Sequence, residues 1–86
     1  MEISVDISMY PLQKEFEAPI LAFIAQLEKE PRVEVVRNEL SKQVHGKYAI
    51  IMPLLEKEMF SVFTEIPDSI FVLKLVGNNR QGILGV

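Results

Sequence analysis

Apolar and polar side chains alternate without a break over the first ten residues. A period of two is typical of a strand with one face in a core and one polar face. We therefore predict a strand over residues 3–10, which Pro11 ends because proline has no amide hydrogen to donate. The apolar set is Ile3, Val5, Ile7 and Met9, and the polar set is Ser4, Asp6, Ser8 and Tyr10.

Two later segments carry apolar residues at spacings of three and four, which predicts amphipathic helices. The first is expected over about residues 17–30, before Pro31, and the second over about 48–65, before Pro67. Pro19 and Pro53 lie early in these helices, where a missing amide hydrogen costs least. The apolar stripes are Phe16, Ile20, Phe23, Ile24 and Leu27, then Ile51, Leu55, Met59, Val62, Phe63 and Ile66.

Three further strands are expected over about residues 33–38, about 40–46 and 70–76. The short junction between the first two predicts an antiparallel hairpin, and Gly46 indicates a turn or a close backbone approach. The last strand is apolar on both faces and needs cover on both. Two helices can cover only one face of the sheet, so we expect the other face to meet a second copy of the chain.

The element order predicts an α+β fold, the ferredoxin-like βαββαβ sandwich, with a four-stranded antiparallel sheet backed by two helices. We expect one such domain over residues 1–76 and a C-terminal tail over 77–86, either frayed or docked on a neighbour. This topology makes the first and third strands neighbours at the centre of the sheet. It would bring Asp6 and Ser8 beside the polar run Ser41–Gly46.

Composition narrows the function classes. The 86-residue chain is 49% hydrophobic, and an apolar surplus in so small a domain favours an oligomer. It has no cysteine, which excludes disulfides and cysteine metal sites and suits the cytoplasm. Its nine basic residues are scattered and its net charge is −3. This charge pattern argues against a surface that binds nucleic acid. It shows no signal-peptide pattern and no apolar run long enough to cross a membrane.

Two segments carry a family resemblance. The opening Ile-Ser-Val-Asp-Ile-Ser-Met-Tyr-Pro-Leu resembles the first strand of the YkoF-like thiamine-binding family. The run Asn38–Gly46 resembles that family's Asn-Pro-Met-Ser-Thr-Gln-Val-x-Gly, with Glu39 and Lys42 where Pro and Thr are common. The resemblance covers roughly residues 2–76.

The resemblance implies a non-enzymatic protein that binds thiamine or its hydroxymethylpyrimidine moiety. It also implies dimers or tetramers associated through their sheets, with the ligand near the sheet surface and the subunit interface. By the same resemblance, the positions that matter most are Ser8, Asn38, Ser41 and Gln43.

The polar side chains suit such a ligand. An aminopyrimidine edge carries ring-nitrogen acceptors and an amino donor, and Asn38, Ser41 and Gln43 can supply both donors and acceptors. The alternative is that they are only the polar side of an exposed strand. Asp6 could accept from the amino group or balance a thiazolium; alternatively, it pairs with Lys42 or Lys74.

The roles of three further side chains remain open. Tyr10 could stack on a planar ring or lie at the edge of the core. His45, the single histidine, could line the pocket or be structural, and it cannot form a multi-histidine metal site. Alternation places Lys42 on the apolar face of its strand; if it points into the pocket it disfavours a cationic thiazolium.

Two other functions stay open. One is an oligomeric structural or regulatory module without a small ligand. The other is a small cofactor-free enzyme with Asp6 or His45 as its base. The acids Glu56 and Glu58 flank Lys57 and are expected on a solvated face, and no glycine-rich phosphate loop precedes a helix.

Overall fold

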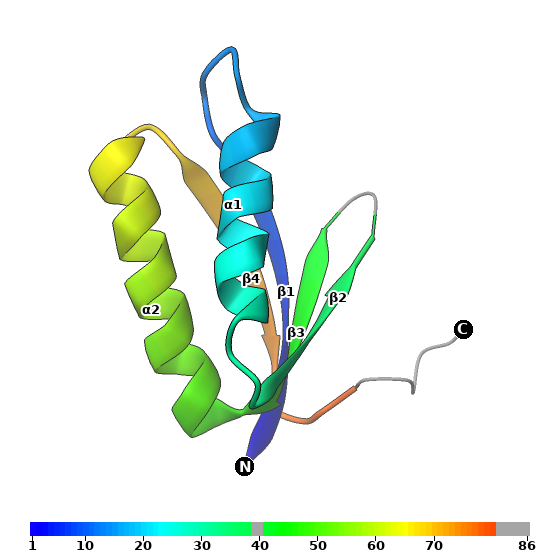
Figure 1. Ribbon diagram of the computed structural model, residues 1–86. Helices are drawn as coiled ribbons and strands as arrows, with labels where there is room; N and C mark the ends of the chain where they lie inside the picture. The colour runs from blue at the N-terminus through cyan, green and yellow to red at the C-terminus, as the bar shows by residue number, and fades with distance from the viewer. Residues whose placement is uncertain (39–40, 81–86) are drawn as a thin grey trace.

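The computed structural model describes residues 1–38 and 41–80 of the chain. These residues form four strands and two helices in the predicted order (Figure 1). Leu40, expected in the third strand, and residues 81–86 of the expected tail lie outside the described residues. The elements are β1 (Glu2–Tyr10), α1 (Glu17–Glu28), β2 (Val33–Arg37), β3 (Lys42–Lys47), α2 (Tyr48–Glu65) and β4 (Ile70–Val76).

The strands form one antiparallel sheet in the order β2-β3-β1-β4. The predicted adjacency of the first and third strands is confirmed, with Ser4 opposite His45 and Asp6 opposite Gln43. On its other side β1 pairs with β4, which places Lys74 opposite Asp6. This is the ferredoxin-like arrangement expected from the element order.

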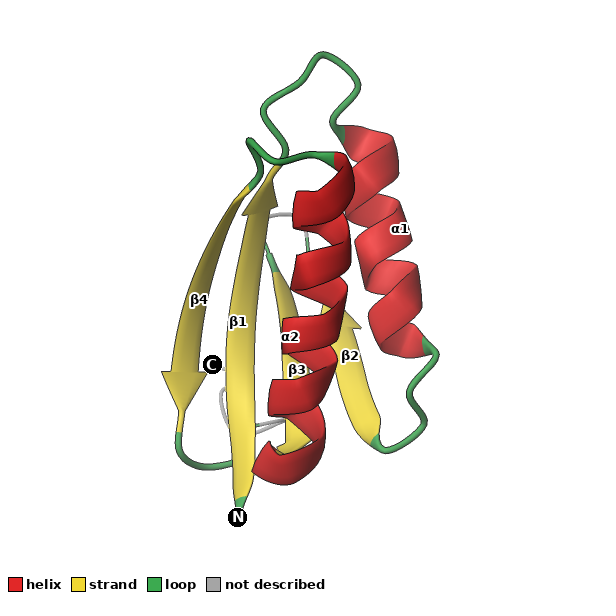
Figure 2. Cartoon of the chain, turned by 90° about the vertical axis from the view of Figure 1, so that its left-hand side faces the viewer, coloured by secondary structure: helices red, strands yellow, loops and turns green. Residues whose placement is uncertain are grey.

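Both helices cover one face of the sheet, and no described helix covers the other (Figure 2). The core lies between these layers, where the odd-numbered residues of β1 meet the apolar stripes of the helices. Its buried members include Ile3, Val5, Ile7, Met9, Phe23, Leu27, Val44, Ile51 and Leu55. We call the side of the sheet without helices the open face.

Three helix predictions need correction. Helix α1 ends at Glu28 rather than near residue 30, because the last turn tightens and Lys29 donates to the Gln26 carbonyl at 3.3 Å. Phe16 precedes α1 and is 51% exposed, so it is not part of the apolar stripe. Glu58, expected on a solvated face, is buried.

Gly46 provides the close backbone approach that the sequence predicted. Its φ is +158°, and a Cβ atom there would lie 3.2 Å from the Arg32 carbonyl oxygen and 3.3 Å from Val33 Cγ1. The start of β2 therefore packs so closely on Gly46 of β3 that a side chain at this position would have no room.

Strand β4 is apolar on both sides, as predicted. Phe71 and Leu73 are half-buried against the helical layer, whereas three β4 side chains on the open face are exposed. These are Ile70, Val72 and Val76. No helix in the described part of the chain is both long and apolar enough to cross a membrane.

After β4 the chain turns back over the open face. Asn79 Nδ2 donates to Glu2 Oε1 at 2.7 Å, and the Arg80 backbone N–H donates to Ser4 Oγ at 2.7 Å. The described part of the tail, residues 77–80, therefore lies against the amino-terminal end of β1.

Candidate functional site

A hollow lies where β1 extends beyond β3. The described pairing between these strands ends at Ile7 opposite Lys42, whereas β1 and β4 remain paired up to Tyr10 opposite Ile70. The cavity beside the last residues of β1 has a volume of about 280 Å³. We call it the strand-end cavity. Its lining is Ser8, Met9, Tyr10, Ile20, Leu21, Ile24, Arg37, Asn38, Ser41 and Lys42.

Four of the seven side chains proposed from the sequence line this cavity: Ser8, Tyr10, Asn38 and Ser41. The Asn38 side-chain oxygen accepts from the Ser41 backbone N–H at 2.7 Å, and the Ser41 carbonyl accepts from the Asn38 N–H at 3.0 Å. Asn favours such turns because its side chain can bond the backbone a few residues on. These bonds hold both residues at the rim.

Helix α1 supplies the apolar wall. Ile20, Leu21 and Ile24 face the cavity from its first turns, and Met9 of β1 closes the core side. The lining thus combines an apolar wall with polar and charged side chains, and small-molecule sites use both kinds of group. The arrangement can hold one face of a flat ligand on hydrocarbon while its edge meets hydrogen-bonding groups.

The charged groups of the cavity are basic. Lys42 lies on the core face, as alternation predicted, and is only 6% exposed. Burial lowers its pKa, although nearby Asp6 opposes this shift. Arg37 also lines the cavity, but Glu28 Oε1 pairs with Arg37 Nη2 at 2.5 Å, and this bond raises the pKa of Arg37. A cationic ligand would meet like charge here.

Asp6 and Gln43 form a cross-strand pair on the open face, next to the cavity but outside its lining. Ser41 Oγ donates to Asp6 Oδ1 at 2.6 Å. The carboxylate therefore orients the cavity-lining serine. The expected ion pair of Asp6 with Lys42 or Lys74 is absent from the described residues.

His45 lies at the other end of the strand pair, away from the strand-end cavity. It is 3% exposed, and its Nδ1 lies 2.7 Å from Ser4 Oγ, which also accepts from the Arg80 N–H. Burial lowers the pKa of His45, with Glu34 on β2 opposing the shift. Among residues 1–38 and 41–80, its Nε2 has no hydrogen-bond partner.

The contributions of Arg37, Met9 and α1 to the cavity were not predicted from the sequence. The α1 residues were recognised as an apolar stripe, but which of them border a cavity depends on how the helix packs. The described residues contain no cluster of three or more potential metal ligands of the His, Cys, Asp or Glu type.

No family model and no curated protein matches the chain. Solved structures do match. Protein SP2199 from Streptococcus pneumoniae superposes with a TM-score of 0.84 at 20% sequence identity, over 96% of this chain and 93% of that one. A Thermotoga maritima protein provisionally assigned to thiamine biosynthesis or salvage (TM0486) gives a TM-score of 0.81 at 12% identity, over 91% and 85%.

A third match is protein MJ1052 from Methanocaldococcus jannascii, with a TM-score of 0.77 at 15% identity, over 91% of this chain and 81% of that one. Identities this low show a common fold. They place the chain among small ferredoxin-like proteins.

Proposed function

We propose that this protein binds the pyrimidine moiety of thiamine, or a closely related aminopyrimidine, in the strand-end cavity, and that it does so without catalysing a reaction. The observation that carries the proposal is the gathering of Ser8, Tyr10, Asn38 and Ser41 around one hollow. The resemblance to thiamine-binding proteins had already drawn attention to three of these, Ser8, Asn38 and Ser41. The fold shared with the Thermotoga maritima protein adds support.

The size of the cavity favours a single ring. Sites for drug-sized ligands occupy roughly 300–1,000 Å³, and this cavity measures about 280 Å³. Hydroxymethylpyrimidine, with one ring and two short polar substituents, is therefore the preferred ligand over whole thiamine.

The positive charge of the cavity also favours hydroxymethylpyrimidine over whole thiamine. Lys42 lines the cavity and carries no ion pair within the described residues. A thiazolium cation beside this ammonium group would be repelled, and the repulsion strengthens as water is excluded. A neutral pyrimidine has no such penalty, and its ring nitrogens can accept hydrogen bonds from Lys42 or Ser8. The Ser41 hydroxyl, which donates to Asp6, can accept a hydrogen bond from the amino group of the ligand.

Self-association through the open face belongs to the same proposal. Ile70, Val72 and Val76 are each between 43% and 47% exposed on β4. Exposed apolar side chains on the uncovered face of a small domain are typical of an interaction surface; Lys74 lies between Val72 and Val76 on this face. The same surface also favours the second candidate function, an interaction module without a small ligand, and ligand binding separates the two.

Ser8→Ala tests the cavity directly. Loss of one neutral hydrogen bond costs about 0.5–1.5 kcal/mol, so the dissociation constant for hydroxymethylpyrimidine should rise roughly 2- to 12-fold. Isothermal titration calorimetry measures it. Gln43→Ala is the matched control, because Gln43 lies on the same polar side of the sheet but outside the cavity lining.

The control should bind within about twofold of the unaltered protein. Equal weakening by both substitutions would place the ligand on the open face instead. Absence of saturable heat with hydroxymethylpyrimidine and with thiamine would favour the interaction module.

A further inference from the structure

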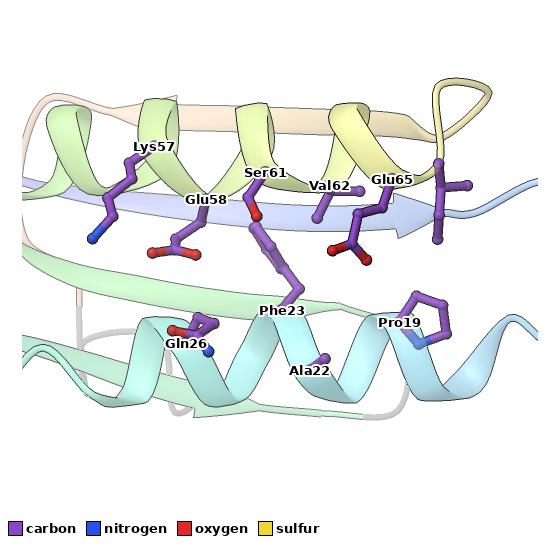
Figure 3. A pocket seen from close by; sticks show the side chains of 10 residues that line it. Pro19, Ala22, Phe23, Gln26, Lys57, Glu58, Ser61, Val62 and Glu65 are labelled. Atoms are coloured by element: carbon purple, nitrogen blue, oxygen red, sulfur yellow. The ribbon is translucent and has the colours of Figure 1, made fainter.

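Two hollows in the described part of the chain differ in the charges that line them. The larger one, about 420 Å³, lies between α1 and α2, and both signs of charge border it, from Lys57, Glu58 and Glu65 (Figure 3). The described lining of the strand-end cavity contains two basic side chains, Lys42 and Arg37, and no acidic one. Its charge is thus opposite in sign to the net charge of the chain, which is −3.

Of these two basic groups, Lys42 is the one that is available to a ligand. Arg37 is already engaged, because its Nε and Nη2 donate to the two carboxylate oxygens of Glu28 at 3.2 and 2.5 Å. The Lys42 ammonium group forms no hydrogen bond or ion pair within the part of the chain that the structure describes. Although the residue is only 6% exposed, its Nζ atom is not sealed from solvent, so the ammonium group opens onto the cavity that Lys42 lines.

The surroundings of this ammonium group favour an anionic partner. The buried Ile7 lies opposite Lys42 on β1, and Ile24 of α1 borders the same cavity. Burial lowers the pKa of Lys42, because hydrocarbon disfavours the charged form. Asp6 opposes this shift, but it lies on the open face and accepts from Ser41 Oγ, whereas Lys42 lies on the core face. A buried charge is best stabilised by a paired opposite charge, which an anion in the cavity would supply.

The proposed pyrimidine ligand has one group that can become anionic without altering the edge of its ring. Its hydroxymethyl oxygen can form a phosphate monoester, which carries between one and two negative charges at neutral pH and strong acceptor oxygens. The cavity supplies donors for such oxygens from the Lys42 ammonium group and from the hydroxyls of Ser8 and Tyr10. The described lining contains no carboxylate that would repel the ester.

We propose that Lys42 makes the strand-end cavity selective for the phosphate monoester of hydroxymethylpyrimidine over hydroxymethylpyrimidine itself. The inference rests on the proposed function, since it requires the pyrimidine to occupy this cavity. The ring lies against the α1 wall of Ile20, Leu21 and Ile24, and the phosphate contacts the Lys42 ammonium group. Lys42 is then the residue that determines the specificity of the site.

The test is isothermal titration calorimetry of the full chain with hydroxymethylpyrimidine, with its phosphate monoester and with inorganic phosphate. The monoester should bind at least tenfold more tightly than hydroxymethylpyrimidine, because hydrogen bonds between charged groups are stronger than those between neutral groups. Inorganic phosphate should bind at least tenfold more weakly than the monoester, because it lacks the contacts of the ring with the apolar wall.

The outcomes separate this inference from the proposed function. Equal affinity for hydroxymethylpyrimidine and its monoester would overturn the selectivity and leave pyrimidine binding intact. Inorganic phosphate that binds as tightly as the monoester would also overturn it, because the cavity would then be a general anion site. Absence of saturable heat with both pyrimidines would contradict the proposed function and the selectivity together.

Variants assign the selectivity to one side chain. Lys42→Met removes the ammonium group and keeps a long side chain, so the monoester should lose its tenfold advantage, whereas Lys42→Arg keeps the charge and should retain it. Lys47→Met is the matched control, because it removes the same charge from an exposed position at the other end of β3, outside the described lining. It should change the ratio of the two dissociation constants less than twofold. An unchanged ratio in Lys42→Met, or an equal loss in Lys47→Met, would overturn the role of Lys42.

The ratio of dissociation constants also guards against a folding defect. Partial unfolding of a variant weakens both ligands by the same factor and leaves their ratio unchanged. Lys42→Gln is a second variant that removes the charge but keeps a polar side chain, and it should show the same loss of preference. A preference of tenfold or more for the monoester in Lys42→Gln would contradict the proposal.

Discussion

His45 and Ser4 show how a polar pair on the open face of a sheet becomes buried. Strand pairing places them opposite each other, and the Arg80 backbone N–H donates to the Ser4 hydroxyl. Sequence alternation correctly assigned Ser4 to the polar side of β1. It could not reveal that the chain returns after β4 to cover that side, because residues 77–80 carry no periodic pattern.

The folded protein should lose stability as the pH falls below about 6.5 because of His45. Burial lowers its pKa, so the unfolded chain takes up a proton at the ordinary value near 6.5 while the folded chain still resists it. The stabilisation is full above that value and is lost as the pH falls toward the folded-state pKa. Urea unfolding at pH 7.5 and pH 5.5 measures the difference in unfolding free energy. Both pH values lie above the range in which most carboxylates titrate.

His45→Gln is the control for this pH effect. It removes the titrating group, so the difference in unfolding free energy between pH 7.5 and pH 5.5 should shrink. An unchanged difference in the variant would assign the effect to another group.

The elements were largely predictable because their periodicities are strong. The bounds of α2 and β4 agree with the sequence prediction, and the alternation in β1 sets both the core face and the neighbours of β3. The burial of Glu58 and the α1 wall of the strand-end cavity were not predictable. Both depend on how two helices pack on one sheet, and that geometry is not encoded in the period of either helix.

The hairpin between β2 and β3 depends on Gly46. Gly46→Ala should lower the unfolding free energy by about 1–3 kcal/mol, because its positive φ is strained for a residue with a Cβ, and that Cβ would crowd the Arg32 carbonyl. Gly77→Ala is the control, since its Cβ would meet only Met1 Cε at 3.7 Å. Chemical denaturation of both variants measures the effect. Equal destabilisation would contradict the close approach at Gly46.

At the scale of the whole molecule, the uncovered side of the sheet supports the proposed self-association. The sequence predicted an apolar surplus and a last strand apolar on both faces, and the open face has exposed Ile70, Val72 and Val76. The excess of apolar residues was visible in the composition. Which copies meet, and over what area, depends on surface shape, which no residue pattern specifies.

Val72→Lys should shift the protein toward the monomer in sedimentation velocity, because it inserts a charge into the proposed apolar interface. A rise of tenfold or more in the dissociation constant of the dimer is expected. Phe60→Lys is the control: Phe60 is 72% exposed but lies on α2, in the opposite layer. If Phe60→Lys dissociates the protein and Val72→Lys does not, the interface lies in the helical layer.

The most direct test of the pyrimidine site is a map of amide chemical shifts during titration with hydroxymethylpyrimidine. Saturable shifts should appear at residues 8–10, at Asn38, at residues 41–42 and at residues 20–24 of α1, around the strand-end cavity. Absence of saturable shifts, or shifts confined to residues remote from these, would contradict the assignment of the cavity as a pyrimidine site.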